Sequence, residues 1–137
     1  MAVPAPMRRV VVERAAHRCE YCRLAQAGQE AAFHIDHVVP VTAGGETESG
    51  NLALACVSCS LRKGARQTGF DPEMGRATPL FNPRREVWDE HFRWKGAMVV
   101  GLTPSGRATI AALRLNRPLI LAIREEERFR DRHPPLR

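Results

Sequence analysis

Two closely spaced pairs of cysteines constrain the fold of this 137-residue chain more than any other feature. The pairs are Cys19 and Cys22 in the segment CEYC, and Cys56 and Cys59 in the segment CVSC. Two thiolates separated by two residues can bind the same ion from one tight turn, here called a knuckle, and two knuckles complete a tetrahedral zinc site. We therefore predict a structural Zn²⁺ bound by all four cysteines. Such a site has no open coordination position, so it stabilises the fold and performs no chemistry.

Composition and the N-terminal segment indicate the compartment. Hydrophobic residues make up 44% of the chain, as in a globular protein, and no apolar run approaches the roughly 20 residues that span a bilayer. The N-terminal segment lacks the apolar core of a secretory signal because Arg8, Arg9 and Arg14 interrupt it. We expect a cytoplasmic protein with no membrane partner. In that compartment the four cysteines are expected to bind metal rather than to form disulfides.

The chain is basic, with 21 lysine and arginine residues, 15 acidic residues and a formal net charge of +6. All but two of the cationic side chains are arginines, whose planar guanidinium binds a phosphate with two hydrogen bonds. This excess favours a polyanionic partner such as nucleic acid, although biased codon usage would produce the same composition. Arg62, Lys63 and Arg66 follow the second knuckle and are the predicted phosphate contacts.

Hydrophobic patterning and breaker residues predict short helices and strands on both sides of the knuckles. Strands are predicted at residues 33–41, 51–56 and 97–103. The first two are antiparallel if the glycine-rich loop between them is a hairpin connection. Helices are predicted at residues 4–18, at 23–32, from 58 onward, after the cap formed by Thr103 and Pro104, and at 117–132. Trp88 and Phe92 are expected in the core, and His91 between them is expected to be structural.

The segment FHIDHVVP, residues 33–40, carries the side chains that are best suited to catalysis or metal binding. His34, Asp36 and His37 interrupt what is otherwise a run of strand-forming residues. Taken alone, the segment fits either a half-buried strand with polar residues on its wet face, or a site with a metal ligand and a general base. Strict strand alternation points Asp36 and His37 to opposite faces, so they converge only if the strand bends or ends there. Pro40 would allow such an end.

Residues Cys19–Gly64 resemble an HNH endonuclease of the ββα-metal class. The similarity lies in CEYC, DHVVP, GG, NLALAC and CSLRK. His37 corresponds to the first His of the motif and Asn51 to its Asn, while the third position, usually His or Asn, is Ser60. The downstream segments DPEMG, PLFNPR, WDEHF and GLTPSGRAT are similar to the tail of a bacterial HNH subfamily.

The resemblance implies a fold and a domain organisation. The fold class is α+β, with an HNH ββα-metal core that contains both zinc knuckles, followed by a C-terminal strand and helices. The core is expected at residues 17–68 and a C-terminal α/β extension at 69–137, within a single domain of residues 1–137. No predicted element has the features of a subunit interface, so the sequence does not decide the oligomeric state.

The resemblance also assigns roles that the chemistry of the side chains supports. It implies that His37 is the general base and that Asp36 binds a catalytic Mg²⁺ or another divalent ion, with Ser60 as a weak further ligand. Asn51 is expected to position His37, and His34 is left open as a ligand, a phosphate contact or a surface residue. The implied activity is metal-dependent hydrolysis of DNA phosphodiester bonds. The alternatives are a zinc-knuckle nucleic-acid-binding protein that has lost cleavage, for which Ser60 argues, and a zinc-built protein-interaction module.

Overall fold

The computed structural model describes residues 2–136, which divide by their internal contacts into two compact units. Unit 1 is Met1–Gln67 with Asn82–Glu86, and unit 2 is Thr68–Phe81 with Val87–Arg137. Both units combine helices with small antiparallel sheets, so the predicted α+β class is confirmed. Two statements stay predictions: that residues 1–137 form a single domain, and that the HNH core within it ends at residue 68.

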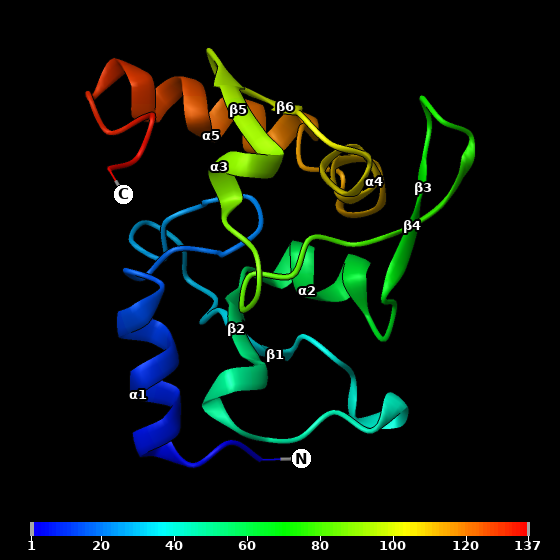
Figure 1. Ribbon diagram of the computed structural model, residues 1–137. Coiled ribbons are helices and arrows are strands. Elements are labelled where there is room, and N and C mark those ends of the chain that lie inside the picture. The colour runs from blue at the N-terminus through cyan, green and yellow to red at the C-terminus, as the bar shows by residue number, and fades with distance from the viewer. Residues whose placement is uncertain (1, 137) are drawn as a thin grey trace. The chain divides into compact units, whose positions relative to one another are not determined.

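Unit 1 contains the two-strand, one-helix arrangement that the resemblance implied (Figure 1). Strand β1 (His34–His37) pairs antiparallel with β2 (Leu52–Ala55), with His34 opposite Ala55 and His37 opposite Leu52. Helix α2 (Val57–Lys63) follows directly and ends at Gly64, whose φ of 53° lies in the left-handed region that favours glycine.

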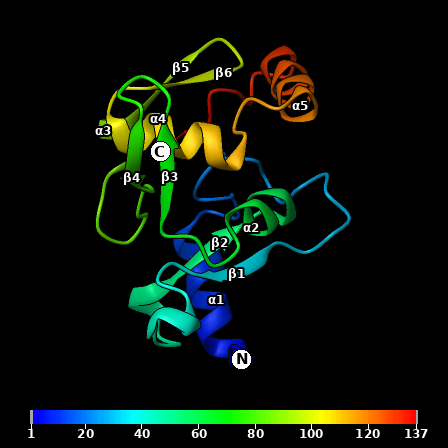
Figure 2. The same ribbon diagram turned by 90° about the vertical axis from the view of Figure 1, so that its right-hand side faces the viewer.

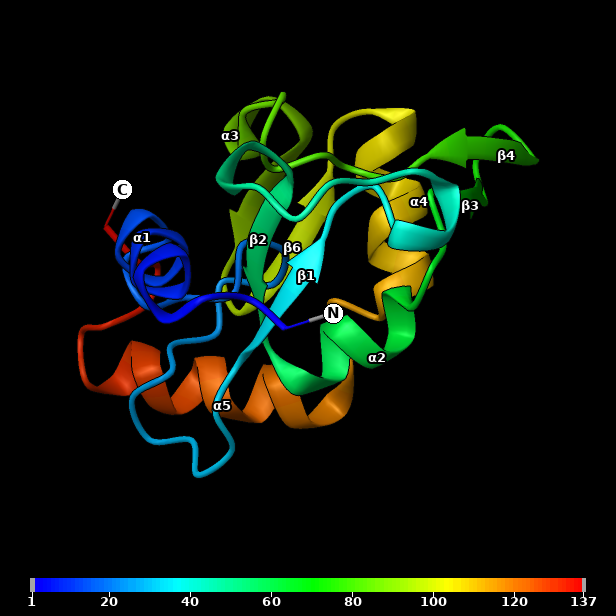
Figure 3. The same ribbon diagram turned by 90° about the horizontal axis from the view of Figure 1, so that it is seen from below.

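The hairpin β1–β2 lies between α2 and the N-terminal helix α1 (Ala5–Arg14), as Figures 1 and 3 show. All four residues of β2 are buried because helices cover both faces of this strand. Helix α1 begins after Pro4, as the sequence predicted, and it ends near residue 14 rather than 18. Its Val11 is fully buried together with Leu52 and Leu54 of β2.

The helix predicted at residues 23–32 is wrong. This segment is a series of turns that begins with an isolated β-bridge between Arg18 and Ala25. The Gln26 side chain organises the turns, since its amide donates to Ala31 O (3.0 Å) and its carbonyl accepts from Phe33 N (2.7 Å). Gly28 has a φ of 86°. A side chain that hydrogen-bonds to the backbone of its own loop competes with helix formation, and in this segment the turns form instead of the helix.

Unit 2 is built on two further hairpins and three helices (Figure 2). The hairpins are β3 (Thr68–Asp71) with β4 (Arg76–Pro79), and β5 (Phe92–Lys95) with β6 (Met98–Gly101). The helices are α3 (Trp88–His91), α4 (Pro104–Leu113) and α5 (Pro118–Phe129). Helix α4 packs on β3, β4 and β6.

The predicted Thr103 cap of α4 is confirmed, because its hydroxyl accepts from Gly106 N at 3.0 Å. The same hydroxyl lies 2.6 Å from His91 Nδ1, which agrees with a structural role for that histidine. Gly106 has to be a glycine, since a Cβ there would lie 2.2 Å from His91 O. Trp88 and Phe92 are buried as predicted, whereas β3, β4 and β5 were not predicted.

An ion pair holds the β3–β4 hairpin to α4. The guanidinium of Arg107 binds both carboxylate oxygens of buried Asp71 at 3.0 Å each, and it lowers the pKa of that carboxyl.

Within residues 2–136, no helix is long and apolar enough to cross a membrane.

Candidate metal centres and active site

The four cysteines come together in unit 1, as the spacing predicted. Their Sγ atoms all lie within 4.8 Å of one another and are buried. The Sγ atoms of Cys22 and Cys56 are 3.7 Å apart. Four thiolates bound to one zinc ion at the usual bond length lie about 3.8 Å apart, so the cage has the size of a tetrahedral zinc site. The cluster is therefore positioned to bind a metal, and both its size and its sulfur donors suit Zn²⁺.

Each knuckle is closed by a backbone amide that points at its first sulfur. Cys22 N lies 3.5 Å from Cys19 Sγ, and Cys59 N lies 3.4 Å from Cys56 Sγ. Hydrogen bonding from Cys19 lowers the pKa of Cys56, whereas burial raises the pKa of Cys19. Buried thiolates need a nearby positive charge, which a bound divalent cation supplies.

The two residues inside the first knuckle connect the cage to the strands. Glu20 accepts a hydrogen bond from Leu54 N at 2.8 Å and forms an ion pair with Arg84, which lies in residues 82–86 of the same unit. The Tyr21 hydroxyl donates to Asp36 Oδ2 at 3.2 Å. Sequence reasoning missed both residues, because nothing in CEYC shows that the two intervening side chains point inward.

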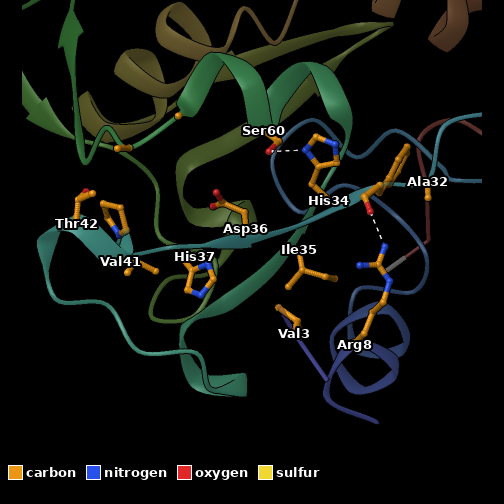
Figure 4. A pocket seen from close by; sticks show the side chains of 14 residues that line it. Val3, Arg8, Ala32, His34, Ile35, Asp36, His37, Val41, Thr42 and Ser60 are labelled. Atoms are coloured by element: carbon orange, nitrogen blue, oxygen red, sulfur yellow. Dashed lines mark hydrogen bonds between the residues drawn. The ribbon is translucent and has the colours of Figure 1, made fainter. Parts of the chain in front are cut away.

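Strand β1 presents its candidate residues on two faces (Figure 4). His34 and Asp36 lie on the side of β1 that faces α2, where His34 points toward Ser60, whereas His37 points to the opposite side together with Ile35. Asp36 and His37 do not converge on one face, because β1 keeps its alternation to its last residue.

Both faces of β1 nevertheless open into one hollow. In the described residues β1 pairs only with β2, so its other edge is free. The hollow along that edge has a volume of about 640 Å³ and is lined by side chains from both faces of the strand, among them His34, Asp36, His37 and Ser60. A phosphate at the free edge of a strand can be reached from both of its faces.

Asp36 is buried, and one of its oxygens is already engaged. Oδ2 accepts from Tyr21 and lies 3.1 Å from Lys63 Nζ. Among residues 2–136 no hydrogen bond to Oδ1 is found, so that oxygen is available to a ligand. Burial raises the pKa of the Asp36 carboxyl, and the ammonium of Lys63 opposes this shift.

The structure contradicts the prediction that Lys63 contacts phosphate. Lys63 is only 2% exposed, and its ammonium binds Asp36 and the carbonyl oxygen of His37 (3.2 Å). The physical reason is helical spacing, since Lys63 lies three residues after Ser60 and shares its face toward β1. Arg62 and Arg66 are exposed, and their contact with phosphate stays a prediction.

His37 has one ring nitrogen held and one open. Nε2 lies 2.9 Å from the hydroxyl of Thr47, and among the described residues no partner is found for Nδ1. If the Thr47 oxygen accepts from Nε2–H, the lone pair of the neutral ring is on Nδ1. Thr47 was not predicted, because a threonine in a glycine-rich loop gives no sign of its partner.

Asn51 closes the loop that follows β1. Its side chain accepts from Val39 N (2.9 Å) and donates to Val39 O (3.0 Å) and Glu46 O (2.9 Å), so it replaces backbone pairing where β1 has ended. Gly45 packs under this contact, and a Cβ there would lie 1.7 Å from Val39 O. Asn51 thus supports the loop that carries Thr47, and its role in positioning His37 stays a prediction.

Comparison with known families bears directly on this unit. Residues 19–66 match the family model described as HNH endonuclease. Residues 19–66 are therefore similar to an HNH domain. The matched residues begin at Cys19 and include both knuckles, β1, β2 and α2. The assignment indicates a nuclease or another nucleic-acid-related function. No curated protein and no solved structure gives a significant match. The similarity of the tail to a bacterial subfamily lies outside the matched residues and stays a prediction.

Proposed function

We propose that the protein is a metal-dependent endonuclease that hydrolyses DNA phosphodiester bonds. One observation carries the proposal: the HNH domain has an imidazole with an open Nδ1 and a carboxylate with an open Oδ1, at consecutive positions along the free edge of one strand. A zinc-built interaction module has no need for this pair.

The residues on the α2 side of β1 fit a hard divalent cation. A carboxylate is the ligand that Mg²⁺ prefers, and Asp36 lines the hollow on the same side of β1 as Ser60. When bound, the ion supplies positive charge to the scissile phosphate and to the leaving oxygen. Tyr21 and Lys63 fix the orientation of Asp36 by holding its other oxygen.

His37 moves the proton in the proposed reaction. Its Nδ1 removes a proton from a water molecule, and the water oxygen forms a bond to phosphorus while the bond from phosphorus to the leaving oxygen breaks. The leaving oxygen takes a proton from solvent. Thr47 holds the ring so that the lone pair stays on Nδ1 during approach of the water.

The proposal is tested by incubating supercoiled plasmid with zinc-loaded protein and Mg²⁺, Mn²⁺ or no added divalent ion. We expect nicked product only with added ion, because the zinc cage has no open position for substrate. DNA binding without cutting under every condition would instead favour the alternative of a non-cleaving nucleic-acid-binding protein, for which Ser60 at the third motif position argues.

DNA affinity is expected to fall as salt rises, because phosphate contacts release counterions. Arg62→Ala and Arg66→Ala should each reduce the slope of log K against log salt by about one, equally on unrelated sequences. The matched control is Arg130→Ala, which removes the same charge from an arginine already paired with Glu126 at 2.7 Å. Fluorescence anisotropy with two duplexes measures the slopes. An affinity that does not change with salt would contradict the assignment of DNA as partner.

A further inference from the structure

We propose that His34 is a nitrogen ligand of the catalytic divalent ion, and that it supplies the donor that Ser60 cannot. The inference rests on the proposed function, in which that ion is bound by Asp36. It further assigns to this site a preference for ions that accept imidazole, such as Ni²⁺ and Co²⁺, relative to a site made of oxygen donors alone.

The position of His34 follows from the period of the strand. His34 and Asp36 are two residues apart on β1, so their side chains leave the same face, on the side of α2, where Ser60 lies beside His34 (Figure 4). All three line the hollow along the free edge of the strand. His37, in contrast, leaves the other face. His34 and Ser60 are therefore in direct contact on the α2 side of β1, and Asp36 lines the same hollow on that side.

One distance within this group matches metal geometry. His34 Nδ1 lies 2.9 Å from Ser60 Oγ. Two donor atoms on adjacent corners of an octahedron, each bonded at the length typical of Mg²⁺, lie about 3.0 Å apart. A hydrogen bond has the same length, so the ring can exchange its contact with the hydroxyl for contacts of both atoms with an ion without moving far. Half-buried His34 has no other recorded partner in the described part of the chain.

Charge explains why a neutral donor is needed there. Asp36 is the one carboxylate among the residues that line the hollow, and Lys63 already neutralises it at 3.1 Å. The pair presents no net charge to an approaching cation, whereas ion affinity in oxygen-ligand sites grows with the number of charged ligands. A neutral imidazole adds a bond without adding charge, and it does so most for ions late in the Irving–Williams order.

Calorimetry without DNA separates the roles of the side chains. Zinc-loaded, untagged protein is titrated with Ni²⁺ and separately with Mg²⁺, as wild type, His34→Gln, Asp36→Asn and, as a matched control, His133→Gln in unit 2. We expect His34→Gln to weaken Ni²⁺ binding by roughly tenfold or more. The same variant should change Mg²⁺ binding by less than about threefold, since Mg²⁺ replaces a lost nitrogen donor with water. His133→Gln should change neither.

The outcomes are distinct. If Asp36→Asn weakens both ions but His34→Gln changes neither, or weakens both equally, the ligand role of His34 is wrong while the metal site of the proposed function stands. If Asp36→Asn also changes neither, both the site and the inference are wrong.

A spectroscopic test on the wild-type protein does not depend on variant folding. With Mn²⁺ as the probe, pulsed electron paramagnetic resonance should detect modulation from a coordinated ¹⁴N, and His37→Gln should keep it. Its absence in the wild type would overturn the proposal.

Discussion

Replacement of His37 by alanine is expected to abolish metal-dependent nicking of plasmid DNA while zinc content and DNA affinity stay at the wild-type level. The ring is the one imidazole on its face of β1, and a positioned general base contributes about 10²–10⁴-fold to rate. Its removal leaves the fold intact, because its recorded side-chain bond ends on the hydroxyl of a surface loop residue, Thr47. The initial rate of nicking at saturating Mg²⁺ measures the effect.

Thr42→Ala is the matched control for this variant. Thr42 is an exposed residue that lines the same hollow, and it has no part in the proposed chemistry. Nicking by His37→Ala at the rate of the wild type would exclude His37 as the base. A loss of zinc or of DNA binding in His37→Ala would show that the substitution acts through the fold.

Replacement of Cys19 by serine is expected to give an unfolded or insoluble protein. Cys19 is fully buried in the sulfur cage, and zinc binding contributes on the order of 10 kcal/mol of folding free energy. The total stability of a small domain is of similar size, about 5–15 kcal/mol, so the loss of the ion removes most of it. Cys56→Ser should behave alike, because Cys56 also caps α2.

Elemental analysis and circular dichroism test this expectation, with one zinc ion per wild-type chain as the reference. Ser58→Ala is the control inside the second knuckle, since the recorded partner of that hydroxyl is the exposed Arg62 side chain. Wild-type protein that is folded and soluble but contains no zinc would refute the zinc assignment. A chelator must be used with care in these experiments, because it removes an ion bound by one carboxylate much sooner than an ion bound by four thiolates.

Features that depend on local chemistry were predictable from the sequence. The spacing of the cysteines specifies a tetrahedral cage, and Thr103 with Pro104 specifies a helix start, because in both cases the partners are a few residues apart. The hairpin of β1 and β2 followed from patterning and from the glycines between the strands. The same logic failed at residues 23–32, where the Gln26 side chain competes with the helix.

Contacts between distant residues were not predictable. Lys63 and Arg62 are adjacent cations in the sequence, yet Lys63 is buried against Asp36 and Arg62 is exposed. The face of α2 on which each side chain lies determines its burial, and the residue type does not. Tyr21 and Thr47 contact Asp36 and His37 across 15 and 10 residues, respectively. No local pattern identifies such partners, so the supporting residues of the site emerge only from the folded chain.

The two donors that hold Asp36 are connected along the chain to the two cysteine knuckles. Tyr21 belongs to the first knuckle, and Lys63 belongs to the helix that the second knuckle begins. The carboxylate is therefore located by the cage rather than by the turns of residues 23–32, which join Cys22 to β1. Insertions or deletions in those turns change the path of the chain but leave both anchors of Asp36 in place, so we expect such changes to leave the position of its carboxylate unaltered.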